Sequence, residues 1–215
     1  MRRFVISFDL DGTLVDYTFV NAVWFEAIPT LYAESRQISF EEALRAVRSE
    51  YDKIGDEQIE WYDLQYWLAR FHLDYEPTRI LGQVRRRVRV YEEVPEVLQR
   101  IATEHILVIN SNCPREFMEI ELQEGGIRGY FRHTFSSTSD FQQIKKTRTY
   151  YERICKIISV EPSSLVHVGD NWKFDYLVPS EVGIKAVYLD RSSLKVGDDI
   201  IYNLTQLEEL LKRYS

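Results

Sequence analysis

The sequence predicts an α/β fold, in which a doubly wound parallel sheet carries a smaller inserted domain made only of helices. Short apolar segments with the composition of buried strands alternate with helical patterns over most of the chain. One interval, residues 17–89, breaks this alternation because it contains helical patterns and no strand pattern. We therefore expect a core formed by residues 1–16 and 90–215, and a helical cap domain formed by residues 17–89.

Four segments predict buried parallel strands, and a fifth is a weaker candidate. Each is short and apolar, and each is bounded by polar residues or glycine. The four strand segments are residues 4–8, 106–110, 165–169 and 185–190, and the weaker candidate is residues 133–137.

Helical patterns fill the intervals between these strands. The segment 114–126 begins with proline and ends with glycine, which is the usual order at the two ends of a helix. In the cap, Ser39 and Glu42 have the spacing of a capping box at the start of a helix. Further helical patterns cover residues 40–54, 61–73, 93–104 and 149–158.

Composition and charge limit the functional classes. The chain has 215 residues, of which 45% are hydrophobic, and a net charge of -7. A folded core is therefore expected, and binding to nucleic acid or to an anionic membrane is not. The sequence shows no signal peptide and no apolar run that would span a bilayer, so we expect a cytoplasmic protein with reduced cysteines. Cys113 has no histidine near it in sequence, and we interpret it as non-catalytic.

Acidic and hydroxyl residues follow several of the predicted strands. Asp9 and Asp11 come at the end of the first strand, Ser111 follows the second, and Asp170 follows the strand at 165–169. Ligands of an open parallel sheet bind at the carboxyl ends of its strands, so these side chains should meet at one edge. Carboxylates so close together repel one another unless a cation lies between them. Hard oxygen ligands suit Mg²⁺, which explains the cluster.

These segments resemble the motifs of the haloacid dehalogenase (HAD) superfamily, most of whose members are phosphatases. "DLDGT" is similar to the first motif, and "ILVINSN" is similar to the second, with Ser111 at the hydroxyl position. "GDNWKFD" is similar to the fourth motif and contains Asp170 and Asp175. The third motif is a lysine before a helix, for which "IKKTRTYYERI" offers both Lys145 and Lys146. The resemblance implies a Rossmann-like core, with the cap inserted between the first and second motifs.

The resemblance also implies magnesium-dependent hydrolysis of a small phosphate monoester through an aspartyl-phosphate. Asp9 would be the nucleophile, and Asp11 would be the general acid and base. The metal would be held by Asp9, by the backbone carbonyl of Asp11 and by Asp170. Gly12 would let the backbone turn close to the phosphate, and Thr13 would position Asp9 or its surroundings, so both belong to the predicted phosphate-binding segment.

Four further positions complete the expected site. Ser111 and the backbone N–H of Asn112 would bind phosphate oxygens. Asp175 would orient the waters of the metal or the lysine, and Asn171 would contact the outer surroundings of the metal.

The lysine remains a choice between two neighbours. A gapless match to the family's usual Lys-Pro pattern favours Lys145. Placing Thr147 at the start of the helix favours Lys146, and we prefer this alternative because threonine caps a helix well.

Other interpretations of the site and of the cap stay open. A phosphomutase would use the same core residues, and a non-catalytic module could bind a phospho-ligand for regulation; a metal-free dehalogenase is disfavoured because Asp11 and Asp170 are present. The expected partner is a small-molecule phosphate ester, and the expected assembly is a monomer or homodimer. The aromatic residues of the cap are interpreted mainly as core, with residues 17–24 as the better candidates for a substrate pocket.

Overall fold

The computed structural model describes residues 3–214, and its core is a parallel six-stranded sheet. The strands lie in the order β3-β2-β1-β4-β5-β6, so the direction of winding reverses beside β1, as in other doubly wound folds. The fold class predicted from the sequence is confirmed. The strands are β1 (Val5–Phe8), β2 (Ile106–Ser111), β3 (Phe131–Ser136), β4 (Leu165–Gly169), β5 (Lys185–Leu189) and β6 (Ile200–Ile201).

The register of the sheet brings three strand ends level with one another. Phe8, the last residue of β1, is paired with Ile109 of β2 on one side and with Val168 of β4 on the other. The three strands therefore end close to the same edge of the sheet, where Asp9 follows β1 while β2 continues to Ser111 and β4 to Gly169. This alignment depends on pairing between distant segments.

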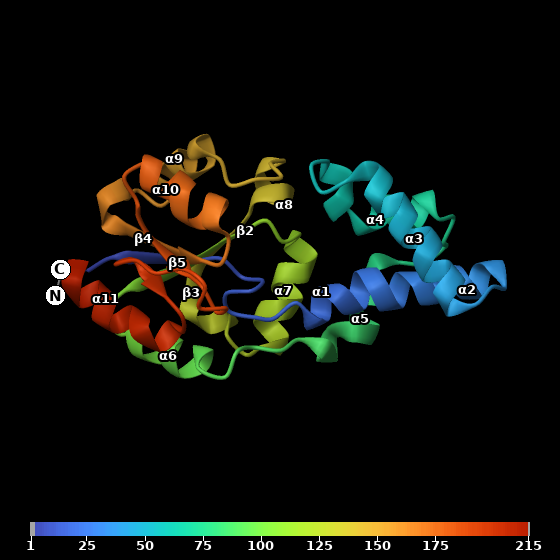
Figure 1. Ribbon diagram of the computed structural model, residues 1–215, viewed down its shortest axis with the longest axis horizontal. Helices are drawn as coiled ribbons and strands as arrows, with labels where there is room; N and C mark the ends of the chain where they lie inside the picture. Colours follow the sequence, from blue (N-terminus) through green and yellow to red (C-terminus); the bar gives the residue numbers. More distant parts are fainter. Residues whose placement is uncertain (1–2, 215) are drawn as a thin grey trace.

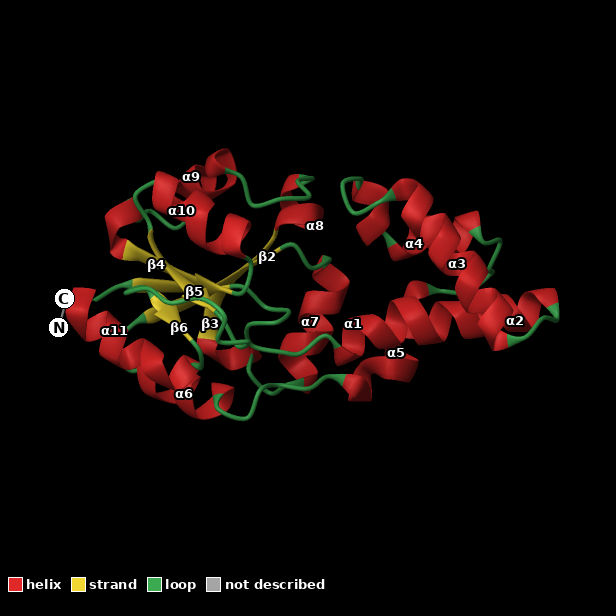
Figure 2. Ribbon diagram, in the orientation of Figure 1, coloured by secondary structure: helices red, strands yellow, loops and turns green. Residues whose placement is uncertain are grey.

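Helices cover both faces of the sheet, as Figures 1 and 2 show. α9 and α10 lie over one face, and α6 and α11 lie over the other. The buried apolar residues form two clusters, of which the smaller includes residues of β4 and α9 and the larger extends from the sheet into the cap. The core helices are α6 (Val94–Ile101), α7 (Arg115–Glu124), α8 (Ser137–Phe141), α9 (Arg148–Ile157), α10 (Val178–Glu181) and α11 (Leu207–Tyr214).

The cap helices lie on the far side of α7 from the sheet (Figure 1). A π-helical turn at Val23–Ala27 joins α1 to α2, so the two helices form one continuous run. Two crossing segments link these helices to the core: the Asp16 N–H donates to the Arg89 carbonyl at 2.9 Å, and the Tyr91 N–H donates to the Leu14 carbonyl at 3.1 Å. The cap helices are α1 (Thr18–Ala22), α2 (Ile28–Arg36), α3 (Phe40–Ile54), α4 (Leu64–Arg70) and α5 (Pro77–Val84).

Most predicted elements are present, with differences at their ends. The capping box of Ser39 and Glu42 is formed at the start of α3. The helix predicted at residues 61–73 begins only at Leu64, because the Asp63 side chain accepts the Tyr66 N–H and caps it there. β6 was not predicted, since two residues are too few to show a pattern. Within residues 3–214, none of the helices has the length and apolarity needed to cross a bilayer.

Candidate active site

Asp9 lies at the carboxyl end of β1 and forms a buried ion pair with Lys146. The lysine Nζ is 2.6 Å from Asp9 Oδ1 and 2.5 Å from Asp175 Oδ1, and it donates a third hydrogen bond to the Asn110 carbonyl at 3.1 Å. Asp9 is 7% exposed and Lys146 is 2% exposed. The lysine is thus fixed at the point where the ends of β1, β2 and β4 meet.

The two candidate lysines have different surroundings. Lys145 reaches towards the cap and forms an ion pair with Glu57, whose side chain is exposed. Thr147 is the N-cap of α9, and its hydroxyl accepts the Tyr150 N–H at 3.3 Å. Lys146 comes immediately before this N-cap residue of α9. Its side chain is buried and points into the core. Lys146 is the lysine that contacts Asp9.

Three carboxylates form a group that fits a divalent cation. Asp9, Asp170 and Asp175 each bring an oxygen to a cluster in which these atoms lie within 4.8 Å of one another. Lys146 forms ion pairs with Asp9 and Asp175 and supplies one positive charge against three negative ones. A hard divalent cation such as Mg²⁺ would offset the remaining charge.

Tyr17 lies directly beside this group. Its hydroxyl donates to Asp170 Oδ2 at 3.0 Å and lies 3.5 Å from the backbone carbonyl oxygen of Asp11. Both oxygens are predicted metal ligands, so the structure brings the Asp11 carbonyl and Asp170 together around one polar atom. The sequence placed Tyr17 only among the pocket candidates.

The pKa values of the three clustered carboxyl groups are shifted by burial and by neighbouring charges. Burial raises the pKa of Asp9 well above its usual range, although the charge of Lys146 acts against it. Burial and the charge of Asp175 raise the pKa of Asp170 to about 6. Burial would also raise the pKa of Asp175, but Lys146 and His167 together hold it below its usual range. Asp175 therefore stays ionised beside the lysine, and a cation would favour the charged forms of the other two.

His167 is a site residue that sequence reasoning missed. It lies inside β4 and is fully buried, with Nδ1 2.8 Å from Ser7 Oγ and Nε2 3.1 Å from Asp175 Oδ1. The Asn171 N–H donates to the other Asp175 oxygen at 3.0 Å. Gly169 allows this approach, because a Cβ there would lie 2.4 Å from Asp175 Cγ. The feature of the sequence that could have indicated a role for His167 is its position within an otherwise apolar strand segment.

The predicted phosphate-binding residues divide into two groups. Ser111 and Asn112 line the cavity beside Asp9. Ser111 Oγ accepts the Cys113 N–H at 3.1 Å, which leaves its own proton for a ligand. Thr13 is fully buried, does not line the cavity, and has no hydrogen-bond partner for its hydroxyl among the described residues. Thr13 is thus placed in the predicted phosphate-binding segment by its position in the chain, while its side chain faces away from the cavity; that it positions Asp9 stays a prediction.

Asn171 lines the cavity beside Asp170, and its side chain has a further structural role. Its side-chain oxygen accepts the backbone N–H groups of Lys173 at 3.1 Å and Phe174 at 2.9 Å. It thereby caps the helical turn Trp172–Leu177, which carries Asp175. The side chain is used to begin this turn, so it acts on the site through the position of Asp175.

Gly12 is required by its close contacts as well as by its backbone. Its φ is +79°, and a Cβ at this position would lie 2.1 Å from Asp170 Oδ2 and 2.6 Å from the Tyr17 hydroxyl. We expect Gly12→Ala to weaken magnesium binding at least about tenfold, since the methyl group would displace Asp170, a predicted metal ligand. Isothermal titration with Mg²⁺ measures this. Gly183→Ala is the matched control, because Gly183 has φ +85° and open space where a Cβ would lie. Equal magnesium affinity in the two variants would contradict the assignment.

A cavity of about 450 Å³ lies between the core and the cap. At one end are the acidic residues, Ser111 and Lys146, and aromatic rings form much of the remaining wall. Trp61 and Tyr62, far from the first motif in sequence, reach this wall, whereas Tyr51 and Trp67 are buried as cap core. The lining aromatic residues are Tyr17, Trp24, Phe25, Trp61, Tyr62, Phe117 and Phe174.

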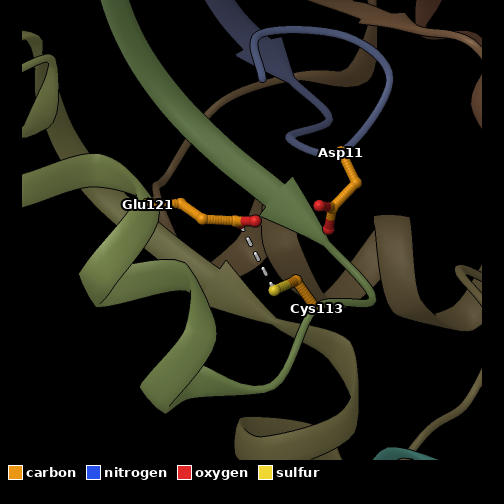
Figure 3. A group of neighbouring side chains, drawn as sticks. All are labelled: Asp11, Cys113 and Glu121. Atoms are coloured by element: carbon orange, nitrogen blue, oxygen red, sulfur yellow. Dashed lines mark hydrogen bonds between the residues drawn. The ribbon is translucent and has the colours of Figure 1, made fainter. Parts of the chain in front are cut away.

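A second group of titratable side chains surrounds the carboxylate of Asp11 (Figure 3). Glu121 of α7 is fully buried, and the Cys113 thiol donates to its Oε2 at 3.7 Å. Burial is the main cause that raises the pKa of Asp11, of Cys113 and of Glu121. Sequence reasoning missed Glu121, although a signal exists: it falls on the buried face of α7, in line with Phe117 and Met118.

A match over most of the chain shows which protein family it belongs to. Residues 5–183 match the haloacid dehalogenase-like hydrolases, which is more than half of the chain. The chain belongs to the haloacid dehalogenase-like hydrolase family. The resemblance inferred from the motifs is confirmed.

Relatives of this HAD protein include two that are named as phosphate-releasing enzymes. The GMP/IMP nucleotidase YrfG of Escherichia coli (strain K12) is 26% identical over 169 residues, which are 77% of this chain and 73% of that protein. The glyceraldehyde 3-phosphate phosphatase of Pyrococcus abyssi is 26% identical over 196 residues, which are 86% of this chain and 80% of that protein. The family match identifies this HAD protein as a hydrolase, and both relatives are named for acting on phosphate esters.

A solved structure supports the same fold. The HAD phosphatase of Thermococcus onnurineus superposes with a TM-score of 0.82 at 23% identity, and the match covers 98% of each chain. At this identity the likeness concerns the fold of the HAD protein.

Proposed function

We propose that this HAD protein is a magnesium-dependent phosphatase that hydrolyses a small phosphate monoester through an aspartyl-phosphate on Asp9. The observation that carries the proposal is the buried contact of Asp9 with Lys146, at the floor of a cavity that Ser111 and Asp170 also line. A nucleophile, a fixed positive charge, a hydroxyl donor and a carboxylate ligand are thus available to one phosphate group.

Each residue has a distinct task in this proposal. Lys146 holds Asp9 Oδ1, so the other carboxylate oxygen of Asp9 attacks phosphorus. The Ser111 hydroxyl donates to a phosphate oxygen, and Lys146 stabilises the charge that develops there. Asp11 donates a proton to the leaving alkoxide and then accepts one from the attacking water. Asp9, Asp170 and the Asp11 carbonyl would hold a Mg²⁺ ion, which would reduce the repulsion between the anionic nucleophile and the phosphate.

The cavity wall favours a leaving group with a planar ring. Trp24 and Phe117 are buried and stack on each other, whereas Trp61 is half-buried, lines the cavity and is backed by Tyr51 with ring centroids 5.5 Å apart. Flat faces of this kind bind nucleobases by stacking. The E. coli relative is named for its action on GMP and IMP. Nucleoside monophosphates are therefore the first substrates to test.

The proposal is tested by measuring phosphate release from a small panel of compounds. The panel contains GMP, IMP, AMP, ribose 5-phosphate and glyceraldehyde 3-phosphate, each with Mg²⁺ and with chelator. We expect magnesium-dependent release, fastest from a purine nucleotide. Release that persists with chelator would contradict the metal requirement. Transfer of phosphate between sugar positions without release would favour a phosphomutase, and binding of a phosphate ester without turnover would favour a regulatory module.

The role of the aromatic wall gives a separate prediction. Trp61→Leu should lower kcat/KM for a purine nucleotide about tenfold, because a stacking face is lost. The same variant should leave hydrolysis of ribose 5-phosphate nearly unchanged. Trp172→Leu is the control, since Trp172 stacks on Tyr176 and does not line the cavity. An equal loss for both substrates would show that Trp61 supports the fold of the cap and does not select the ring.

A further inference from the structure

Three side chains from separate segments face one another below the cavity. Asp11 follows β1, Cys113 follows β2, and Glu121 lies on α7 (Figure 3). One oxygen or sulfur atom from each belongs to a group whose members lie within 4.8 Å of one another. The Cys113 Sγ is 3.7 Å from Glu121 Oε2. Two ligands of one tetrahedral zinc ion, with bonds of about 2.3 Å to sulfur and about 2.1 Å to oxygen, lie about 3.6 Å apart.

Two carboxylate oxygens of this group lack partners. Glu121 is fully buried, and its Oε1 has no hydrogen-bond partner among residues 3–214. Asp11 Oδ1 is also buried and also has no hydrogen-bond partner among these residues. No ion pair with a lysine, arginine or histidine of the described chain is formed by either carboxylate. A buried carboxylate oxygen without a partner is costly, and two carboxylates that face each other are more so. A cation bound between them would satisfy these oxygens and would replace the hydrogen bonds that Asp11 shares with Glu121 and Cys113.

We propose that Asp11, Cys113 and Glu121 form a binding site for a zinc-class divalent cation, distinct from the magnesium ligands. The thiol sets the class of ion, because Mg²⁺ takes oxygen ligands and a thiolate prefers zinc or a similar softer metal. Binding displaces the thiol proton and any proton held by the two carboxyl groups. Asp11 also lines the cavity, so the ion enters from there and keeps a water molecule as its fourth ligand.

The site makes zinc an inhibitor of the enzyme, a consequence that rests on the proposed function. The positive charge of the ion would keep a bound Asp11 carboxylate ionised, so Asp11 would not carry the proton that the leaving group needs. The magnesium ligands are the Asp11 backbone carbonyl and other carboxylates, so saturating Mg²⁺ would not displace zinc from the Asp11 side chain. Micromolar zinc should therefore inhibit phosphate release even in excess Mg²⁺.

Cobalt provides a readout that does not depend on activity. Co²⁺ added to the protein in saturating Mg²⁺ should give the near-ultraviolet charge-transfer absorption of a thiolate–cobalt bond, and Zn²⁺ should abolish it. Cys113→Ser should lose this absorption, and its zinc affinity should fall at least about tenfold by isothermal titration. Glu121→Gln should weaken zinc binding to a similar extent. Cys155→Ser is the matched control, because Cys155 is a buried cysteine of α9 in the second apolar cluster.

The outcomes of the cobalt and zinc experiments test the zinc site independently of the proposed phosphatase function. The absorption band in wild type and in Cys155→Ser, together with its loss in Cys113→Ser, supports the site even if no phosphate ester is hydrolysed. Zinc inhibition, measured against each variant's own zinc-free rate, should be relieved in Cys113→Ser. No band, or a band that survives in Cys113→Ser, overturns the site while leaving the phosphatase proposal intact. Absence of zinc binding would mean that the carboxyl pair and the thiol are satisfied by shared protons alone.

Discussion

Asp9→Asn is expected to reduce phosphate release roughly 10⁴-fold or more without unfolding the protein. A carboxamide cannot attack phosphorus to form the acyl-phosphate, so the step that starts hydrolysis is lost. The fold should persist because Lys146 keeps its second ion pair, with Asp175 at 2.5 Å. The substitution also removes one of three crowded carboxylates.

Steady-state kinetics and thermal unfolding of the Asp9→Asn variant test this result together. Asp63→Asn is the matched control, since Asp63 is an exposed aspartate outside the cavity and asparagine caps a helix equally well. The control should keep full activity. If Asp9→Asn retained more than about a hundredth of the rate, Asp9 would not be the nucleophile.

Substitution of the two neighbouring lysines by alanine is expected to have very different effects. Lys146→Ala leaves Asp9 and Asp175 buried without their cation, so the free energy of unfolding should fall by about 3–5 kcal/mol. The rate should fall about 10³-fold as well, because the positive charge at the phosphate is lost. Lys145→Ala removes a contact with the exposed Glu57 and should change stability and rate little.

Chemical denaturation and kcat measurements distinguish the two lysines. Lys146→Arg provides a folded variant if Lys146→Ala proves too unstable to purify. It keeps the charge but cannot place it at the same point, so a loss of at least about tenfold in kcat is expected with modest destabilisation. Comparable losses in the Lys145 and Lys146 variants would mean that the charge is shared by both.

The strands and the acidic residues after them were predictable because both signals are local. A short apolar run that ends in a carboxylate can be recognised in the sequence, whereas the pairing of Phe8 with Ile109 and Val168 joins segments remote in sequence and was not predicted. The capping box of Ser39 and Glu42 was predictable as well, because it depends on residues three positions apart.

Side chains that reach the site from distant segments were harder to predict. Trp61 is separated from Asp9 by most of the cap, and its place in the cavity wall depends on how the cap helices pack. Thr13 follows the first motif directly, yet the turn at Gly12 leaves its side chain buried away from the cavity. Sequence spacing fixes which residues are neighbours along the chain, and packing fixes which way each side chain points.

The sequence by itself determined the doubly wound sheet, the helical insertion and the convergence of Asp9, Asp11 and Asp170, because period and motif spacing are properties of short segments. The tertiary structure alone decided that Lys146, not Lys145, contacts Asp9. It also decided that Glu121 faces Asp11. The physical reason is the same in both cases: such contacts are set by the packing of α9 and α7 against strands remote in sequence, where a change of one position turns a side chain from the interior to the solvent.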